Sequence, residues 1–333
     1  MLFDPVVVSL LLGYILDLII GDPVYPFHPV RIIGRAASSF EIYLRGNFRR
    51  EFLAGFIFTA VIVFTSMSIS WVVVLLSALI SPYVLLVFST YFIYSSISVR
   101  DLIRHAVSVK NALVNGDVSI ARQRVSLMVS RKTEHLSENE IIRAVIESMS
   151  ESTVDGIIAP LLYASIFGAP GAIGYKAAST LDSMVGYKDT HYMNFGRASA
   201  RLDDVLSFVP ARFSVMIFAF AALLCGRSPV RTIRTIFRYR GKSASPNAGI
   251  QMAAVAGALN IRLGGVCEYD GKKVSTLEFG GDRKDLKISD IDICAVFVCV
   301  SSLLAIMLAA LLRTVIFILL LPHIGELLSK KIY

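Results

Sequence analysis

The stretch FLAGFIFTAVIVFTSMSISWVVVLLSALISPYVLLVFSTYFIYSSISV, residues 52–99, decides the fold. It is 48 residues long and contains no Asp, Glu, Lys, Arg or His. Because one bilayer crossing takes about 20 apolar residues, the stretch is long enough for two membrane-spanning helices. Ser81-Pro82 is the expected break, since proline interrupts a helix. We therefore expect spans near 53–80 and 82–99.

The composition of the whole chain supports a membrane protein. Of its 333 residues, 55% are hydrophobic and 17% are charged, whereas about a quarter are charged in an ordinary soluble protein. Further apolar stretches predict spans near 3–20, 205–226 and 293–321. The first lacks the basic leading region of a signal peptide, so we expect it to be retained. The sequence thus predicts an all-α, polytopic membrane protein, with residues 1–333 as one membrane-embedded domain.

Residues 157–175 are uncharged but differ from a plain span. Proline and glycine interrupt them at Pro160, Gly168, Pro170, Gly171 and Gly174. A regular helix disfavours these residues. Irregular backbone at membrane depth persists only where it is buried in protein or lines a wet cavity. We expect a broken or re-entrant segment beside a functional site.

The net charge of +8 is concentrated in two basic segments. Residues 227–292 carry twelve Lys or Arg against seven Asp or Glu, and residues 31–51 carry five Arg against two Glu. We expect residues 227–292 to form a basic loop. The positive-inside rule predicts that this loop and the shorter segment 31–51 both face the cytoplasm. No aromatic stacking pattern accompanies the basic residues, so we expect no nucleic acid as a partner and favour phospholipid headgroups or anionic substrates. The four cysteines show neither zinc spacing nor a disulfide framework.

Residues 101–155 form a polar segment that we expect to be helical. Ser137 and Glu140 match a capping box, which predicts a helix start near Glu138. An apolar residue then recurs every three or four positions, which gives the helix one apolar face.

The opposite face of this helix carries acids. Glu147, Glu151 and Asp155 follow Arg143 at steps of four residues. A solvated face with an Arg143–Glu147 ion pair would account for them. Because the helix runs into the segment broken by glycine and proline, where unpaired carboxylates are costly, Mg²⁺ binding is the alternative.

The segment 175–212 is dense in balanced charge. Its basic residues include Lys176, Lys188, Arg197 and Arg201, and its acidic residues are Asp182, Asp189, Asp203 and Asp204. Balanced charges at a membrane boundary are often simple ion pairs. A phosphate clamp of Lys and Arg beside metal-binding Asp is the functional interpretation. The spacing leaves both open.

The stretch LDLIIGDPVYPFHPVRIIGR, residues 16–35, places Asp17 in an apolar context. An acid inside a span is a functional-site hypothesis by default. A lone His28 between prolines is more often structural than a ligand.

In RGKSASPNAG, residues 240–249, Gly241-Lys242-Ser243 matches the end of a P-loop, but the glycine that must precede it is absent. We therefore reject a P-loop. Ser245 or Asn247 is expected to cap the following helix of small residues, whose plainest role is close packing.

Four blocks of the sequence resemble, in order and spacing, the membrane-bound adenosylcobinamide-phosphate synthase family of cobalamin biosynthesis. The blocks are GDPVYPFHPVRIIGR (21–35), ESTVDGIIAPLLY (151–163), GAPGAIGYKAASTLDSMVGYKDTHYMNFGRASARLDDVLSFVPAR (168–212) and SPNAGIQMAAVAGALNIRLGG (245–265). Together they cover most of the chain outside the apolar stretch 52–99 and the last span. The chain departs from the family pattern at Ser152, Ser179 and Ile250.

The resemblance implies an ATP- and Mg²⁺-dependent carbon–nitrogen ligase. Its substrates would be the corrinoid adenosylcobyric acid, through one propionate side chain, and (R)-1-aminopropan-2-ol phosphate. The implied partners are the lipid bilayer and other membrane enzymes of corrinoid nucleotide-loop assembly. The implied location is the plasma membrane, with several spans and an active site that faces the cytoplasm. Whether the activated intermediate is an acyl phosphate or an adenylate stays open.

The resemblance and the charged residues together give a site hypothesis. The expected ligands of Mg²⁺-ATP are Glu147, Glu151, Asp155 and Asp182. The expected phosphate and cofactor contacts are Lys188, Arg197, Arg201, Asn247, Arg31 and His28. Lys176 is expected to neutralise developing charge, and Asp203 or Asp204 to act as the base. If the site lies at the membrane surface, Glu151 and Asp155 should lie close to Asp182 and Lys188.

Two other functions remain possible on sequence grounds. Charged stripes beside broken helices also occur in transporters of organic anions or divalent cations, although no inverted repeat is visible here. A non-enzymatic membrane-sensor relative is the second alternative, and the presence of all four blocks argues against it.

Overall fold

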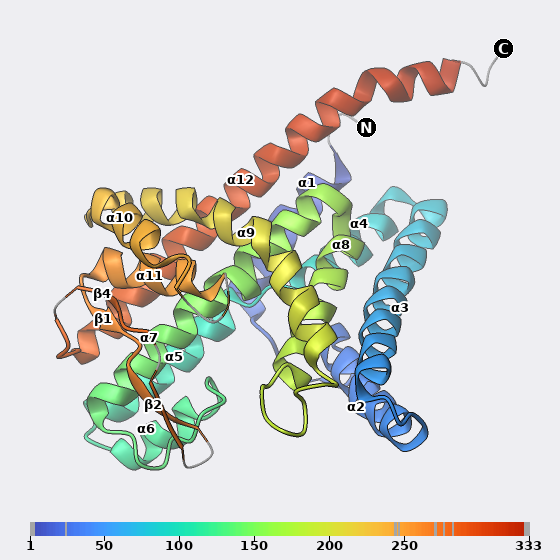
Figure 1. Cartoon of the computed structure of the whole chain (residues 1–333). Coiled ribbons are helices and arrows are strands. Elements are labelled where there is room, and N and C mark those ends of the chain that lie inside the picture. The colour runs from blue at the N-terminus through green and yellow to red at the C-terminus, as the bar shows by residue number, and fades with distance from the viewer. Residues whose placement is uncertain are drawn as a thin grey trace. The chain divides into compact units, whose positions relative to one another are not determined.

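A computed structural model describes residues 4–23, 25–242, 245, 247–269, 272–275, 277–281 and 283–329. Most of these residues are helical, as the sequence predicted (Figure 1). Contacts between residues divide the chain into two compact units. The first comprises Met1–Ile97, Ala159–Asp203 and Ala305–Tyr333, and the second comprises Ser98–Ile158 and Asp204–Leu304. Segments of the two units alternate along the chain, and a single membrane-embedded domain over 1–333 stays a prediction.

The first unit is built from five helices and parts of two more. They are α1 (Pro5–Ile20), α2 (Pro29–Asn47), α3 (Glu51–Ile80), α4 (Pro82–Tyr94) and α8 (Ala159–Val185). α8 packs against all of the other four. The core of the first unit includes Phe58 of α3, Leu181 of α8 and Phe195. The rings of the two phenylalanines lie 5.1 Å apart. α8 is thus the central helix of this unit.

The second unit combines helices with two short strand pairs. Its helices are α5 (Val99–Val114), α6 (Val118–Val125), α7 (Glu138–Thr153), the π-helical turn η1 (Val154–Ile158), α10 (Pro229–Tyr239) and α11 (Ala248–Leu259). Strands β1 (Arg262–Leu263) and β4 (Phe279–Gly280) form one antiparallel pair, and β2 (Val266–Tyr269) and β3 (Lys272–Ser275) form another. α7 packs against α5, α6 and α11.

Two long helices contribute residues to both units. They are α9 (Arg197–Leu224) and α12 (Ile288–Ser329). Both are long because apolar residues fill most of their length, as the sequence predicted near 205–226 and 293–321.

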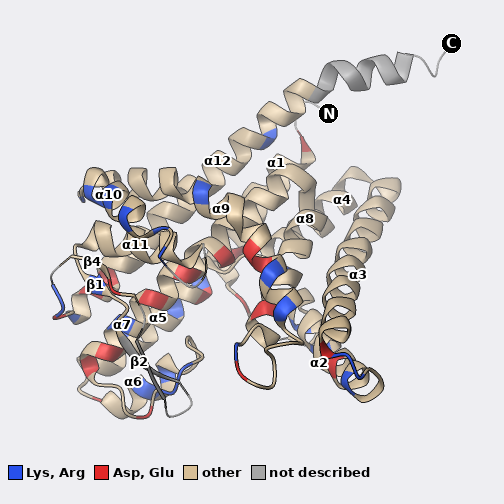
Figure 2. Ribbon diagram, viewed as in Figure 1, with Lys and Arg blue, Asp and Glu red and all other residues tan. Residues whose placement is uncertain are grey.

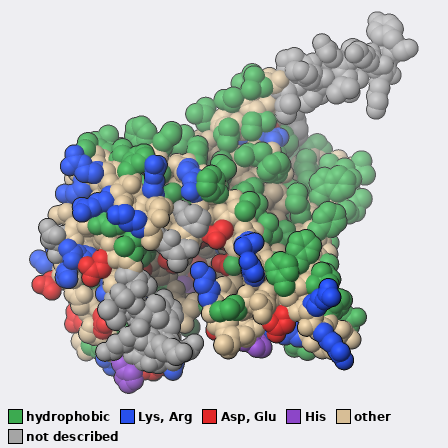
Figure 3. Space-filling view, in the orientation of Figure 1, with side chains coloured by type: hydrophobic (Ala, Val, Ile, Leu, Met, Phe, Trp, Pro, Cys, Tyr) green, Lys and Arg blue, Asp and Glu red, His purple; other side chains and the backbone are tan. Residues whose placement is uncertain are grey.

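The break between the first two predicted spans is confirmed. α3 ends at Ile80, and α4 begins at Pro82, which is suited to a first helical position because it lacks an N–H group. The Ser81 hydroxyl accepts a hydrogen bond from the N–H of Val84 at 3.2 Å. Figure 2 shows that these two helices are uncharged over nearly their whole length, and Figure 3 shows the hydrophobic surface that α3 presents.

Five described helical segments are long and apolar enough to cross a membrane. They are Glu51–Ile80, Pro82–Val114, Glu138–Val185, Arg197–Leu224 and Ile288–Leu319. This set differs from the prediction at two places. α1 has 16 residues and so extends only about 24 Å, less than the roughly 30 Å hydrocarbon core, whereas the segment through 157–175 is long enough.

The predicted irregularity of 157–175 takes the form of two local distortions in a helical path. The π-helical turn precedes α8, and a kink interrupts α8 at Gly168, where φ is 69° and ψ is −162°. That conformation is open almost only to glycine. Pro170 follows two residues later and removes a backbone donor. That the segment is re-entrant stays a prediction.

The basic region 227–292 is more ordered than the expected loop. It contains α10, α11 and the four strands found among the described residues. The helix of small residues predicted after Asn247 is confirmed as α11, and it is buried because Ala and Gly side chains allow neighbouring backbones to approach closely.

Candidate functional site

Glu147 on α7 is a buried, hydrogen-bonded carboxylate. The capping box of Ser137 and Glu140 starts α7 where the sequence predicted, so the acidic face develops as expected. One oxygen of Glu147 accepts from the Arg131 guanidinium at 2.7 Å, and the other accepts from the Gly264 N–H at 2.7 Å. The predicted metal ligand Glu147 therefore joins three segments of the second unit.

Arg143, one turn earlier, strengthens the same junction. Its guanidinium donates to the Gly264 carbonyl at 2.9 Å and lies 3.9 Å from the Glu147 carboxylate. The expected Arg143–Glu147 pairing exists, and it is part of a buried network rather than a solvated face.

Asp155 lies in the π-helical turn that follows α7. The Gly156 carbonyl accepts from the Ser98 N–H at 3.1 Å, and a β-carbon on Gly156 would come within 2.8 Å of the Ser98 hydroxyl. Glycine thus lets the chain at Ser98 approach the turn. Such turns recur at functional sites, because they redirect side chains that a regular helix would align differently.

Gln251 of α11 reaches Asp155. Its side-chain nitrogen donates to the Asp155 carboxylate at 3.2 Å, although the side chain is only 1% exposed. The other amide atom, Oε1, is buried and has no hydrogen-bond partner among the described residues. A buried acceptor without a donor is costly, so this oxygen is a suitable ligand for a bound group.

Asn247 and Asp204, both predicted site residues, lie together in the second unit. The Asn247 amide donates to the Asp204 carbonyl at 2.8 Å and accepts from Arg212 at 2.7 Å. The Ser245 hydroxyl donates to the Asp204 carboxylate at 2.8 Å. This network fixes the start of α11 on α9, one turn before Gln251.

The oxygen ligands of this part of the second unit suit a hard cation. Asp155 and the exposed Glu151 supply carboxylates, and Gln251 supplies the buried amide oxygen. Within the described part of the chain, no three His, Cys, Asp or Glu side chains are grouped closely enough to hold a metal alone. Mg²⁺ commonly takes one or two carboxylates and completes its shell with water and phosphate oxygens, so these residues fit it in the presence of a phosphate ligand.

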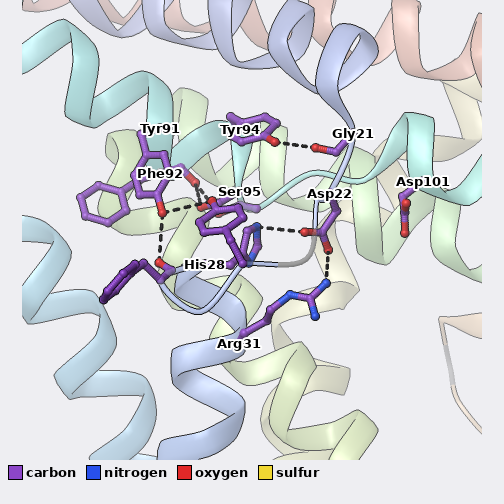
Figure 4. Close-up of polar contacts among 12 residues, drawn as sticks. Gly21, Asp22, His28, Arg31, Tyr91, Phe92, Tyr94, Ser95 and Asp101 are labelled. Atoms are coloured by element: carbon purple, nitrogen blue, oxygen red, sulfur yellow. Dashed lines mark hydrogen bonds and ion pairs between the residues drawn. The ribbon is translucent and has the colours of Figure 1, made fainter.

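A second polar cluster lies in the first unit, on the chain between α1 and α2 (Figure 4). The Asp22 carboxylate is 3.4 Å from Nε2 of the buried His28 and 3.8 Å from the Arg31 guanidinium. Burial lowers the pKa of His28; Asp22 opposes that shift, and the positive charges of Arg31 and Lys176 add to it. At neutral pH His28 is therefore neutral, and its Nδ1 has no hydrogen-bond partner among the described residues.

Aromatic residues enclose this second cluster. The Tyr94 hydroxyl donates to the Gly21 carbonyl, and the Tyr91 hydroxyl donates to the Phe27 carbonyl at 3.1 Å. The Tyr25 ring meets the His28 ring edge-on at 5.4 Å. The proline-rich connection between the helices is thereby held around His28 and Asp22.

The remaining predicted residues lie in the first unit. Lys176 and Asp182 are on α8, exposed Lys188 follows it, and Arg197, Arg201 and Asp203 are on α9. Asp203 is close enough for its charge to act on the Tyr163 hydroxyl. The structure groups His28, Arg31 and Lys176 in one unit and Asp155, Asp204 and Asn247 in the other. That Glu151 and Asp155 meet Asp182 and Lys188 stays a prediction.

Sequence reasoning missed Asp22 and Gln251 as site residues. Asp22 had a usable signal, because it lies in the same resembling block as His28. Gln251 had a weaker one: it is the only hydrogen-bonding side chain among the twelve residues of α11.

These features define a polytopic α-helical membrane protein that keeps carboxylate, amide and basic side chains inside its helical units. A protein-family profile described as CobD/Cbib protein matches residues 10–319. The chain belongs to this CobD/CbiB family.

Curated relatives agree with the family profile. A cobalamin biosynthesis protein CobD of Clostridium perfringens is 41% identical over 285 residues, which cover 85% of this chain and 90% of the relative. A cobalamin biosynthesis protein CobD of Klebsiella pneumoniae is 39% identical over 299 residues, which cover 89% of this chain and 94% of the relative. A cobalamin biosynthesis protein CbiB of Salmonella choleraesuis is 38% identical over 301 residues, again covering 89% and 94%. No solved structure matches the chain.

Proposed function

We propose that this protein acts in cobalamin biosynthesis as an ATP-dependent amide ligase, an adenosylcobinamide-phosphate synthase. It would join (R)-1-aminopropan-2-ol phosphate to a propionate of adenosylcobyric acid. The observation that supports this proposal is family membership over residues 10–319, together with relatives named as cobalamin biosynthesis proteins. The side chains of the two clusters are consistent with it.

Amide formation from a carboxylate and an amine is uphill in water, so the carboxylate must first be activated by ATP. In this proposal Glu151 and Asp155 hold Mg²⁺-ATP, and Gln251 orients Asp155 through its hydrogen bond. Bound Mg²⁺ would neutralise charge on the phosphate oxygens. Glu147 acts differently from the initial hypothesis: both of its oxygens are engaged, so it supports the helix that carries the other two acids.

Basic residues of the first unit would bind the anionic groups of the substrates. Arg31 and Lys176 are close enough to His28 to affect its charge, which makes this cluster a candidate for a phosphate. Lys188, Arg197 and Arg201 are exposed and available for the same purpose. Asp203 or Asp204 would take the proton from the incoming amine.

The location proposed for the protein is the plasma membrane, with the active site facing the cytoplasm, where ATP is present. Other membrane enzymes of nucleotide-loop assembly are proposed partners, because they would take up a product released at the same membrane.

The decisive experiment supplies purified protein with adenosylcobyric acid, aminopropanol phosphate and Mg²⁺-ATP. We expect an amide product by mass spectrometry, and ATP hydrolysis only when both organic substrates are present, since activation is productive only with its nucleophile bound. Substrate flux into sealed vesicles without amide formation would instead support a transporter. A protein that shows neither amide formation nor substrate flux would support the membrane-sensor alternative.

A further inference from the structure

The corner between α2 and α3 carries a pocket outside both clusters. It has a volume of about 690 Å³ and is lined by Arg49, Arg50, Glu51, Phe52, Leu53 and Asn194. One part of its lining is therefore cationic and another part is apolar. All of these residues belong to the first unit.

Both acids at this corner form ion pairs with a different arginine. Arg45 lies 2.9 Å from the Glu41 carboxylate and 3.8 Å from that of Glu51. It also lies over the Phe195 ring, at 4.3 Å, and donates to the His191 carbonyl at 3.1 Å. Arg45 therefore serves to fasten the 186–196 segment to the corner.

Arg49 and Arg50 add two positive charges to the corner. Both are exposed, and neither side chain makes a hydrogen bond or ion pair with any residue that the structure describes. A third guanidinium, that of Arg197, lies 5.9 Å from the Phe52 ring. The pocket thus offers the guanidinium groups of Arg49 and Arg50 to an anion, while the carboxylate in its lining, Glu51, is paired with Arg45.

The pocket lies where a membrane-spanning helix begins. α3 starts at Glu51 and exposes large apolar side chains from its first turns onward, including Phe52, at 50%, and Phe56, at 56%. Figure 3 shows basic side chains next to the hydrophobic surface of α3, and Figure 2 places charge at the α2–α3 corner. The start of a span is the level of lipid headgroups.

We infer that this pocket binds the phosphate of an anionic phospholipid. Arg49 and Arg50 contact the phosphate, while Phe52 and Leu53 contact the glycerol and the first acyl carbons. A soluble phosphate would use the arginines but gain nothing from the apolar side chains. Basic residues next to a span attract anionic lipids for the same electrostatic reason.

The test compares lipid retention by native mass spectrometry of the full chain in detergent. Arg49→Gln/Arg50→Gln is compared with Lys132→Gln/Lys284→Gln, which removes two exposed positive charges outside the pocket. The probes are dioleoylphosphatidylglycerol, dioleoylphosphatidylcholine and glycerol 3-phosphate. A third variant, Arg49→Lys/Arg50→Lys, keeps the charge.

We expect wild type and the control Lys132→Gln/Lys284→Gln to prefer phosphatidylglycerol over phosphatidylcholine. Arg49→Gln/Arg50→Gln should bind phosphatidylglycerol at least about tenfold more weakly, since each basic residue contributes about a fivefold effect near an anionic surface. The lysine-for-arginine variant should retain most of the preference. Phosphatidylglycerol binding by Arg49→Gln/Arg50→Gln as strong as that of wild type would overturn the inference. Binding of glycerol 3-phosphate as strong as that of the lipid would also overturn it, in favour of a soluble phosphate.

Discussion

Glu147 and Glu151 are one helical turn apart but differ in burial. Glu147 is buried between Arg131 and Gly264, whereas Glu151 is exposed. Glu147→Gln should lower the free energy of unfolding by about 3–5 kcal/mol, because the buried ion pair between Arg131 and the Glu147 carboxylate would be broken. Glu151→Gln should leave stability within about 0.5 kcal/mol of wild type yet abolish amide formation. Thermal unfolding and product mass measured on both variants check this, and normal turnover by Glu151→Gln would remove it from the site.

Gln251 permits a test of the Asp155 side chain that leaves every carboxylate in place. Gln251→Met retains volume but removes the hydrogen bond to Asp155. The apparent affinity for Mg²⁺ should fall about 10- to 100-fold, the range typical for loss of a residue that orients a metal ligand. The Mg²⁺ dependence of amide formation is the measurement, with Met252→Leu, the next residue along α11, as control. An unchanged dependence would limit Gln251 to packing.

His28 should make stability depend on pH. Its pKa is lowered from 6.5, chiefly by burial, so below about pH 6.5 the unfolded chain takes up the proton before the folded chain does. The free energy of unfolding should therefore fall as pH decreases through this range. Melting temperatures at ~pH 7.5 and ~pH 5.5 should differ less in His28→Gln than in wild type. His191→Gln, at an exposed position, should keep the wild-type difference; a result with the two variants alike would contradict the prediction.

The alignment of the acidic residues could be predicted from sequence, but their burial could not. Helical periodicity correctly placed Arg143 beside Glu147. The residue that covers Glu147, Gly264, lies 117 positions further along the chain, and nothing local to α7 indicates it. Gln251 escaped notice for the same reason, since its partner Asp155 lies 96 positions away.

At the scale of elements, α8 provides a matched pair of glycines. Gly168 has positive φ at the kink, so Gly168→Ala should destabilise the protein by about 1–3 kcal/mol. Gly174 has ordinary helical geometry, and a β-carbon there would meet Met67 at 3.4 Å, an ordinary contact. Gly174→Ala should therefore be neutral or stabilise by up to about 1 kcal/mol. Thermal unfolding of both variants tests the kink, and equal effects would contradict it.

Element boundaries followed the sequence where the signal was local. The capping box starts α7 at Glu138, and Ser81-Pro82 separates α3 from α4 as predicted. The π-helical turn had no local signal in the sequence, and the Ser98 N–H that donates to its Gly156 carbonyl lies 58 positions earlier in the chain. Apart from α11, helical structure within 227–292 was not predicted, because the high content of basic residues suggested a loop.

The basic segments predict the orientation of the whole molecule in the membrane. Both 31–51 and 227–292 are rich in arginine and lysine, and the positive-inside rule places such segments in the cytoplasm. In a variant with all four natural cysteines replaced by serine, a cysteine at the exposed position Asn47 or Lys284 should react with an impermeant maleimide in inside-out vesicles only. Reaction of either position in right-side-out vesicles would reject this orientation.

Composition was sufficient to predict a polytopic helical protein, because a low charge content leaves few other solutions for 333 residues. It could not predict two compact units. That division depends on segments such as 98–158 and 204–304, which pack together although 45 residues separate them in the chain.

The Glu147 junction has a consequence for the order of events during synthesis. Arg131 leaves the ribosome before Glu147, so the ion pair can form at once, but Gly264 is translated 117 residues later. At about 5–20 residues per second this delay is roughly 6–23 seconds. During that time the nascent chain must keep one carboxylate oxygen of Glu147 hydrated, next to segments that are already entering the bilayer. Ribosome pausing between these two codons would prolong that exposed state, and faster elongation would shorten it.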